Sequence, residues 1–283
     1  MIATVGVIGA GTMGGGIAGV AARAGLDVIL HDSVPSALTA AIERIGNDLR
    51  SGAARGKRSA EEAAGALARV RSCSSLHDLA SAGIVIEAAV EDLDVKQAIV
   101  RALDQIVSPS AIIATNTSSL SITAIASVCR NPETVVGMHF FNPPAAMQLV
   151  EVVRGHRTSD ETAMTVRDLA TRFGKIPVIC SDTPGFIVNR VARPFYGEAL
   201  RLLAEGVGSV EQIDAILTRS GGFRMGPFAL MDLIGIDVNY AVSRSVYEQF
   251  FHEPRFRPHP IQRRMVEAGV LGRKTGKGFY TYK

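Results

Sequence analysis

The sequence is poor in charged residues and has no long run of one sign. Charged residues make up 20% of the 283 positions, and 30 Lys and Arg against 27 Asp and Glu leave a net charge of +3. Nucleic-acid-binding proteins carry clustered basic residues, so this pattern excludes nucleic acid as the expected main partner. Hydrophobic residues reach 47%, which excludes a disordered chain. We expect one large or two modest domains with a hydrophobic core.

Cysteine is scarce. Cys73, Cys129 and Cys180 are odd in number, far apart and without CxxC spacing. They exclude a disulfide framework and a zinc site, and are typical of reduced packing thiols in a cytosolic protein. We therefore expect no metal ligand among them.

Long apolar runs are also missing, since no segment reaches the ~18 unbroken apolar residues of a membrane helix. The stretch 1–22 has no charged residue and in that respect resembles a signal peptide. A signal peptide would begin with basic residues, whereas the first cation here is Arg23, after the apolar run. We expect a cytoplasmic protein with no membrane partner.

Short runs rich in Val and Ile alternate with helical patterns through the first 184 residues. This alternation is typical of an α/β fold with a doubly wound, mostly parallel sheet. Strands are expected at 3–8, 28–30, 84–86, 111–114, 135–139, 149–153 and 177–180, and helices at 12–25, 35–70, 93–107 and 160–173.

The pattern changes at the turn 182–185, after which no strand-like run appears before 279–282. Helices are expected at 186–205, 210–219, 227–251 and 260–268. We therefore expect an N-terminal domain over 1–184 and an all-helical C-terminal domain over 185–283. The apolar helix over 186–203 suits a face that packs against a partner subunit.

A GxGxxG segment, GAGTMG at 9–14, follows a predicted strand and opens a predicted helix. Gly9 permits the tight turn, Gly11 lets backbone amides approach a pyrophosphate, and Gly14 allows the helix to pack closely on the strand. The pyrophosphate then lies at the positive end of the helix. The pattern predicts a Rossmann-type domain whose cofactor-binding residues include Gly9, Gly11, Thr12, Met13 and Gly14; the alternative is a glycine-rich turn without a ligand.

Asp32 follows the second predicted strand, where a carboxylate accepts hydrogen bonds from the adenosine ribose hydroxyls. It would repel a 2′-phosphate, and no Arg follows it in 33–36. NAD is therefore the expected cofactor rather than NADP. The alternative is that Asp32 is the N-cap of the next helix.

Four polar residues lie beyond predicted strand ends or at the domain boundary, where open α/β sheets bind ligands. His139 is suited to take a hydroxyl proton during alcohol oxidation, and Glu151 can fix its tautomer if the two strands are neighbours. Ser118 and Asn189 can orient substrate oxygens. Each also has a structural alternative: a structural His, a surface acid, a cap for the helix that includes 122–128, and a satisfied helix amide.

Six segments of the chain then point to one family. They are GAGTMG (9–14), IEAAVED (86–92), ATNTSSL (114–120), GMHFFNP (137–143), PGFIVNR (184–190) and GRKTGKGFY (272–280). Together they resemble the L-3-hydroxyacyl-CoA dehydrogenase family over the whole chain, and especially its short bacterial 3-hydroxybutyryl-CoA dehydrogenases.

The resemblance implies an enzyme that reversibly oxidises (S)-3-hydroxyacyl-CoA to 3-oxoacyl-CoA with NAD. It implies His139 as general base, Glu151 as its carboxylate partner, and Ser118 and Asn189 as contacts of the reacting oxygens. NAD contacts are implied for Asp32, Glu91, Lys96, Ser118, Asn142 and Lys274. An acyl-CoA thioester is the implied substrate, and the C-terminal helical domain is implied to bind substrate and to form a homodimer.

Two segments depart from this pattern or fit it loosely. Where the family often has NHPMGP, this chain has GFRMGP at 222–227, which affects the expected lining of the acyl pocket. The region expected to meet the CoA phosphates, 50–58, is basic through Arg50, Arg55, Lys57 and Arg58. The alternative for this cluster is a solvated helix face.

Two other functions remain open at this stage. A related dehydrogenase acting on a free hydroxy acid, of the L-gulonate type, would share the fold and the catalytic residues. A non-catalytic, crystallin-like dinucleotide-binding protein would bind NADH without turnover, although competent residues occupy all four catalytic positions.

Overall fold

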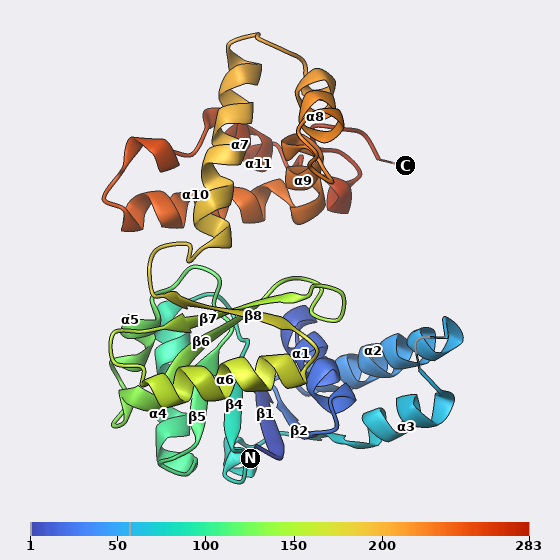
Figure 1. Cartoon of the computed structure of the whole chain (residues 1–283), viewed down its shortest axis with the longest axis vertical. Coiled ribbons are helices and arrows are strands. Elements are labelled where there is room, and N and C mark those ends of the chain that lie inside the picture. The colour runs from blue at the N-terminus through green and yellow to red at the C-terminus, as the bar shows by residue number, and fades with distance from the viewer. Residues whose placement is uncertain (1, 57, 283) are drawn as a thin grey trace. The chain divides into compact units, whose positions relative to one another are not determined.

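A computed structural model of the chain describes residues 2–56 and 58–282 (Figure 1). It divides into two compact units, Met1–Thr183 and Pro184–Lys283. Each unit has its own hydrophobic core, and each is described by itself below.

The N-terminal unit is built on an eight-stranded sheet with the order β3-β2-β1-β4-β5-β6-β7-β8. Neighbouring strands are parallel except β6 and β7, which are antiparallel. The strands are β1 (Thr4–Ile8), β2 (Asp27–His31), β3 (Val70–Cys73), β4 (Ile84–Glu87), β5 (Ile112–Thr115), β6 (Val135–Phe140), β7 (Leu149–Arg154) and β8 (Ile176–Ser181). The predicted α/β fold class is confirmed.

Apolar residues on alternate sides of the strands hold helices on both faces. Ile84 and Ile86 of β4 join the core that includes α1 (Thr12–Arg23), α2 (Pro35–Ala54) and α6 (Asp160–Arg172). On the other side, Val85 lies close to Leu79 of η1 (Leu76–Leu79). Helices α4 (Leu93–Ile106) and α5 (Ile122–Ala126) contact each other, and α4 also contacts η1. Strands buried on both sides carry continuous Val and Ile runs for this reason.

The segment 35–70, predicted to be helical, contains two separate helices, and its last residue begins a strand. Helix α2 ends at Ala54, and α3 (Ala60–Ala68) begins anew at a capping box in which Ser59 and Glu62 bond each other's backbone N–H groups. After α3 the chain forms β3, which pairs with β2 at the edge of the sheet. The exposed Arg71 and Ser72 are typical of an edge strand and hide it from a hydrophobicity pattern.

The C-terminal unit contains five α-helices among its described residues: α7 (Val188–Ala204), α8 (Val210–Arg219), α9 (Pro227–Ile234), α10 (Ile236–Gln249) and α11 (Pro260–Glu267). Leu200, Phe228, Met231 and Ile236 lie in its core. The predicted single helix over 227–251 breaks at Gly235, whose φ of 102° is outside the helical region. The predicted strand over 279–282 is also wrong, since only isolated bridges occur there, one of them between Lys277 and Thr281.

Two buried carboxylates fix the end of the chain to this unit. Asp232 accepts hydrogen bonds from the backbone N–H groups of Phe279 and Tyr280, both at 2.9 Å, and from the Tyr282 hydroxyl at 2.9 Å. Asp214 accepts from the N–H groups that begin α9 and from the Tyr280 hydroxyl at 3.0 Å. A carboxylate can accept several hydrogen bonds at once. The protein donors therefore replace the hydrogen bonds to water that Asp214 and Asp232 lose when they are buried.

We expect Asp232→Asn to lower the free energy of unfolding by about 2 kcal/mol, because an amide cannot accept from all three donors and its NH₂ group opposes some of them. Urea unfolding followed by circular dichroism measures this. The exposed Glu267→Gln on α11 is the control and should stay within about 0.5 kcal/mol. An Asp232→Asn protein as stable as the control would contradict the assigned role.

Candidate active site

The glycine-rich loop lies between β1 and α1 and is shaped for an anion. Gly9 has a φ of 95°, and a Cβ added at Gly14 would overlap the Gly9 carbonyl oxygen. Helix α1 has Gly11 as its N-cap, with no capping side chain and no acidic residue in its first turn, which holds Thr12 and Met13. Its N–H groups and its dipole therefore suit a pyrophosphate, so this loop fits a dinucleotide.

Asp32 follows β2 beside this loop. Its Oδ2 accepts from the Ala10 N–H at 2.6 Å, and its Oδ1 accepts from the Val34 N–H at 2.9 Å. The alternative of Asp32 as the helix N-cap is wrong, because Val34 holds that position in α2. Asp32 instead ties the end of β2 to the glycine-rich loop.

Glu91 holds the turn that follows β5. Its Oε1 accepts from the Thr117 hydroxyl at 2.7 Å, the Ser118 N–H at 2.8 Å and the Ser119 N–H at 3.1 Å. The Ser118 hydroxyl also donates to this oxygen, at 3.2 Å. The alternative of Ser118 as a helix cap is wrong, since Ser121 caps α5.

A buried ion pair lies beneath this turn. The Lys96 ammonium, whose side chain is 1% exposed, donates to both Glu87 oxygens at 2.8 and 3.0 Å and lies 3.5 Å from Glu91. Thr115 donates its hydroxyl to Glu87 at 2.6 Å. The sequence analysis missed Glu87 and Thr115 as members of this network, because spacing along the chain does not report a contact between residues 28 positions apart.

These neighbours determine the pKa of Glu91. Partial burial raises it, but the Lys96 charge and the hydrogen bonds from Thr117 and Ser118 lower it more, so the pKa lies below its ordinary value of 4.5. Glu91 therefore stays ionised and keeps its acceptor role down to acidic pH.

His139 and Glu151 meet through the one antiparallel pairing of the sheet. The register of β6 and β7 places His139 opposite Glu151, and the imidazole Nδ1 lies 2.8 Å from Glu151 Oε2. Both residues are buried, at 5% and 1% exposure. Because an ionised carboxylate only accepts, this contact assigns a proton to Nδ1, and Nε2 is the acceptor nitrogen whenever the imidazole is neutral. The Phe141 ring packs beside the imidazole at 4.5 Å between centroids.

Asn116 was also missed by the sequence analysis. Its Oδ1 accepts from the Phe140 N–H at 2.9 Å and its own N–H donates to the Glu87 carbonyl at 2.7 Å. It therefore links the ends of β4, β5 and β6. Its position in the ATNTSS segment was the available signal. Asn142 comes two residues after the last of these contacts and is exposed.

The N-terminal unit thus brings most of the predicted residues to the carboxyl ends of β1, β2, β4, β5 and β6. The other two lie in the C-terminal unit. Asn189 is in the first turn of α7, where its carbonyl accepts from Arg193 Nε at 3.1 Å. Lys274 forms a 2.6 Å ion pair with Asp237, and the pKa of Asp237 is lowered because that ion pair outweighs the opposing effect of burial.

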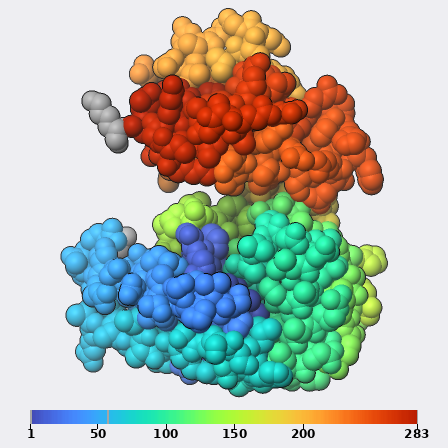
Figure 2. All heavy atoms as spheres, turned by 180° about the vertical axis from the view of Figure 1, so that it is seen from behind, coloured from blue at the N-terminus to red at the C-terminus, as the bar shows by residue number. Residues whose placement is uncertain are grey.

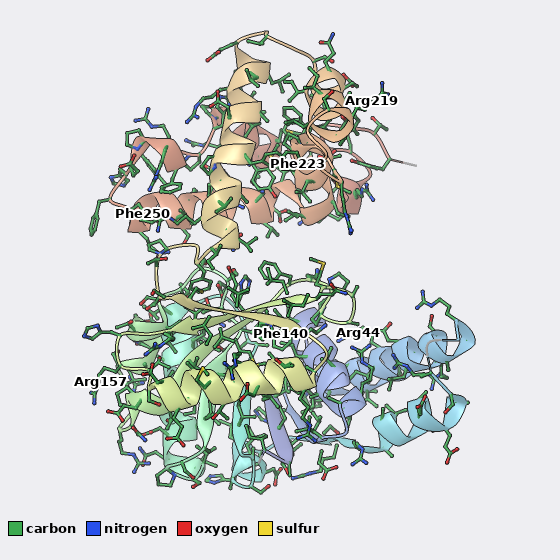
Figure 3. The ribbon with its side chains drawn as sticks, viewed as in Figure 1. Arg44, Phe140, Arg157, Arg219, Phe223 and Phe250 are labelled. Carbon is green, nitrogen blue, oxygen red and sulfur yellow. The ribbon has the colours of Figure 1, made fainter. Side chains whose placement is uncertain are left out.

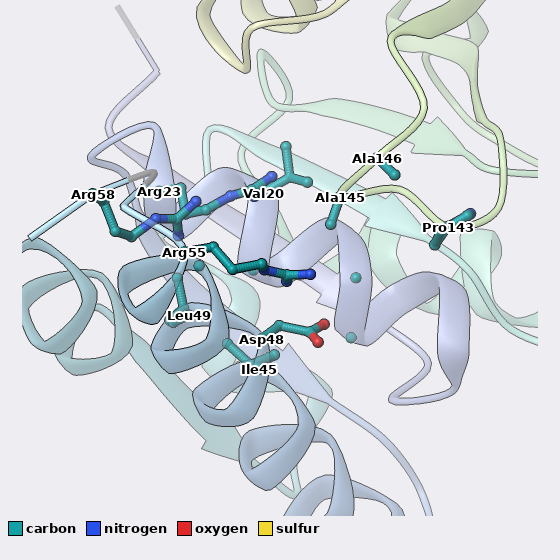
Figure 4. Close-up of a pocket in the computed structure, with 14 residues that line it drawn as sticks. Val20, Arg23, Ile45, Asp48, Leu49, Arg55, Arg58, Pro143, Ala145 and Ala146 are labelled. Atoms are coloured by element: carbon teal, nitrogen blue, oxygen red, sulfur yellow. The ribbon is translucent and has the colours of Figure 1, made fainter. Parts of the chain in front are cut away.

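A basic pocket of about 300 Å³ lies along α1 and α2 (Figure 4). Arg23, Arg55 and Arg58 line it, with Asp48 as a carboxylate among them. Burial and the nearby Arg58 charge lower the pKa of Arg23, against the opposing effect of Asp48. Arg50, from the predicted basic cluster, is not in the lining, and Lys57 lies outside the described residues. In the space-filling view, α2 and α3 form an outer side of the N-terminal unit in blue (Figure 2).

The cysteines do not contribute to these sites as nucleophiles. All three are free thiols, and burial raises the pKa of Cys129 to about 11 and that of Cys180 to about 12. Within the described residues, no helix is long and apolar enough to cross a bilayer. In the same part of the chain, no three His, Cys, Asp or Glu side chains gather as a metal site requires.

The N-terminal unit therefore belongs to the class of dinucleotide-binding α/β domains, defined by its sheet order, its GxGxxG loop and the acid after β2. Comparison with known families makes this specific. Residues 4–183 match the NAD binding domain of 3-hydroxyacyl-CoA dehydrogenase, and residues 185–282 match the C-terminal domain of that enzyme. The chain belongs to the 3-hydroxyacyl-CoA dehydrogenase family.

Individual relatives agree with this assignment. The chain is 50% identical to the 3-hydroxyadipyl-CoA dehydrogenase of Escherichia coli over 282 residues, but spans only 59% of that protein. It is 42% identical to a 3-hydroxybutyryl-CoA dehydrogenase of Clostridioides difficile, covering 98% of both chains. The crystal structure of (S)-3-hydroxybutyryl-CoA dehydrogenase from Ralstonia eutropha matches with a TM-score of 0.96 at 43% identity, covering 100% of both chains. The predicted family and the predicted NAD cofactor are confirmed.

The pKa of Glu91 gives a prediction for stability against pH. A carboxyl whose pKa is depressed on folding stabilises the protein above its unfolded pKa, and this contribution is lost as the pH falls through the folded value. We expect Glu91→Gln to destabilise the protein at neutral pH and this difference to shrink below about pH 4.5. Urea unfolding of both proteins across pH measures it. Glu43→Gln, an exposed site on α2, is the control, and a Glu91→Gln difference independent of pH would refute the account.

Proposed function

We propose that this chain catalyses the NAD-dependent, reversible oxidation of short-chain (S)-3-hydroxyacyl-CoA thioesters, such as 3-hydroxybutyryl-CoA, to 3-oxoacyl-CoA. The observation that carries the proposal is the buried His139–Glu151 pair, with its 2.8 Å hydrogen bond, in the same unit as the dinucleotide loop. The chain is similar over nearly its whole length to 3-hydroxybutyryl-CoA dehydrogenases, and this similarity supports a short-chain 3-hydroxyacyl-CoA as the substrate.

In this proposal His139 is the general base. The lone pair of Nε2 takes the hydroxyl proton of the substrate as the hydride leaves carbon 3, so the alcohol loses one proton and one hydride and becomes a ketone. NAD⁺, when bound, supplies the hydride acceptor. Glu151 stabilises the imidazolium that forms, because its carboxylate already accepts from Nδ1. In the reverse direction the imidazolium returns the proton.

The remaining predicted residues take the roles that the family resemblance implies. Ser118 would orient the reacting oxygen, and the turn that carries it is held by Glu91. Asn189, from the C-terminal unit, would contact the same oxygen. The N-terminal residues Gly9, Gly11, Thr12, Met13, Gly14, Asp32, Glu91, Lys96, Ser118 and Asn142, with Lys274, would bind NAD. For Lys96 the burial of the ammonium against Glu87 supports a role through Glu91.

We also propose that the basic pocket along α2 binds the phosphates of CoA. Arg55 and Arg58 offer planar donor groups that match phosphate oxygens. Arg55 is the C-cap of α2 and Arg58 precedes α3, and both line the pocket. The pocket belongs to the N-terminal unit and is lined in part by Pro143 and Ala145, which follow β6, the strand of His139 (Figure 4).

A homodimer formed through the C-terminal unit is a further part of the proposal. Helices α7, α8, α9 and α10 each expose an apolar side chain: Val191, Ile216, Leu233 and Val238, respectively. Exposed apolar side chains of this kind support burial against a second copy of the chain. The cytoplasmic location stays a prediction.

His139→Gln tests the catalytic role. We expect kcat for acetoacetyl-CoA reduction to fall by ~10²- to 10⁴-fold, the usual contribution of a general base, while the Kd for NADH stays unchanged. The rate is followed by NADH absorbance, and His156→Gln, at an exposed His after β7, is the control. A nearly intact rate in His139→Gln would remove His139 from the mechanism.

The unaltered protein distinguishes the two alternative functions. Equal activity on 3-hydroxybutyrate and on its CoA thioester would favour a dehydrogenase of free hydroxy acids. NADH binding without any turnover would favour a non-catalytic dinucleotide-binding protein.

Charge removal at the pocket tests CoA binding. We expect Arg55→Ala combined with Arg58→Ala to raise KM for acetoacetyl-CoA at least about tenfold, since each lost charged hydrogen bond costs roughly 1.5 kcal/mol or more. The N-acetylcysteamine thioester of acetoacetate lacks the nucleotide, so its kcat/KM should not change. An equal loss on both substrates would assign the two arginines a structural role instead.

A further inference from the structure

We infer that Arg44 of α2 is a positioning residue for the dinucleotide: it holds the Ala10 peptide of the glycine-rich loop and so sets the affinity for NAD. The inference deepens the proposed function, on whose NAD-binding part it rests. It stands on contacts within the N-terminal unit alone.

Ala10 is held at both of its backbone groups by side chains from later elements. Its N–H donates to Asp32 Oδ2 at 2.6 Å, and its carbonyl oxygen accepts from the Arg44 guanidinium at 2.7 Å. Ala10 itself is 0% exposed, and a buried carbonyl without a donor would cost free energy. Arg44 supplies a charged donor to this carbonyl from 34 residues further along the chain.

The position of Arg44 is fixed by the packing of two helices (Figure 3). Ala41 and Ile45, on either side of Arg44 in α2, are buried in the core shared with α1. Gly15 and Gly19 of α1 face these residues: a Cβ added at Gly15 would lie 3.6 Å from Ala41 and 3.7 Å from the Arg44 guanidinium, and one at Gly19 would lie 3.6 Å from Ile45, all at ordinary contact distance. The guanidinium is therefore carried to the loop by a rigid helix pair.

Two consequences follow for an anion at the start of α1. First, the bonds to the Ala10 N–H and to the Ala10 carbonyl hold the peptide groups on both sides of this residue. The Gly11 N–H shares a peptide group with that carbonyl, so its direction is fixed, and with it the start of the first helical turn, whose N–H groups are the donors for a pyrophosphate. Second, the Arg44 charge offsets the negative end of the Ala10 carbonyl, which otherwise lies close to the anion site. Both effects raise affinity without direct contact between Arg44 and the cofactor.

Arg44→Gln is the test, with Arg172→Gln as the matched control. Arg172 also donates to a backbone carbonyl, that of Ile2 at 2.9 Å, but at the opposite end of β1 from the loop. Each variant thus loses one arginine–carbonyl bond from the same unit. We expect Arg44→Gln to raise the Kd for NADH, measured by fluorescence titration, about tenfold, and Arg172→Gln to change it less than twofold.

Three further measurements separate a positioning role from a merely structural one. ADP-ribose, which has the pyrophosphate but no nicotinamide, should lose affinity for Arg44→Gln by the same factor as NADH. Turnover at saturating NADH should stay within twofold of the parent. Arg44→Lys, which keeps the charge, should recover part of the affinity, and it replaces Arg44→Gln as the test if that variant does not fold.

Unchanged NADH affinity in Arg44→Gln would overturn the inference. Equal weakening by Arg44→Gln and Arg172→Gln, or a loss of kcat without a change in Kd, would overturn it as well. These titrations need no acyl-CoA, so a parent protein that binds NADH but does not turn over acetoacetyl-CoA would refute the proposed reaction while leaving Arg44 testable.

Discussion

The pairing of β6 with β7 is the constraint on which the candidate chemistry depends. The other strand pairs of the sheet are parallel, but β7 runs antiparallel to β6, and this pairing places Glu151 directly opposite His139. A shift of one residue would turn Glu151 to the other face of the sheet and break the 2.8 Å hydrogen bond. Apolar neighbours such as Met138, Val150 and Val152 are buried on the core side and fix the register against such a shift.

Carboxylates serve repeatedly as the tethers that bring distant segments together. Asp32 binds the glycine-rich loop, Glu91 binds the Ser118 turn, and Asp182, just after β8, accepts from backbone N–H groups at the start of α5. Asp214 and Asp232 do the same in the C-terminal unit. An ionised carboxylate accepts several bonds, so one side chain can hold a turn that no sheet or helix supports. The polar residues around the site are thus held by other polar residues and not by packing alone.

The sequence predicted the parts that rest on local signals: seven of the strands, the glycine-rich loop, and Glu151 as the partner of His139 if their strands are neighbours. It did not predict β3, whose exposed Arg71 and Ser72 conceal an edge strand, or the break at Gly235, where one glycine ends a helix within an apolar run. Glu87, Thr115 and Arg44 were missed for a different reason. Their roles come from contacts between residues far apart in the chain, and neither composition nor spacing reports such contacts.

In the proposed function Asp32 both binds the cofactor and holds the glycine-rich loop, which bears on any redesign of cofactor preference. A protein engineer seeking NADP use would replace this acid to relieve repulsion of the extra phosphate, yet its Oδ2 also accepts from the N–H of Ala10, the residue whose carbonyl oxygen accepts from Arg44. Removing the carboxylate would leave the Ala10 N–H without this acceptor. The glycine-rich loop would then be held less firmly, and the affinity for both NAD and NADP would fall. A successful swap therefore has to restore an acceptor for Ala10 as well as add a cation, which makes this a two-site engineering problem.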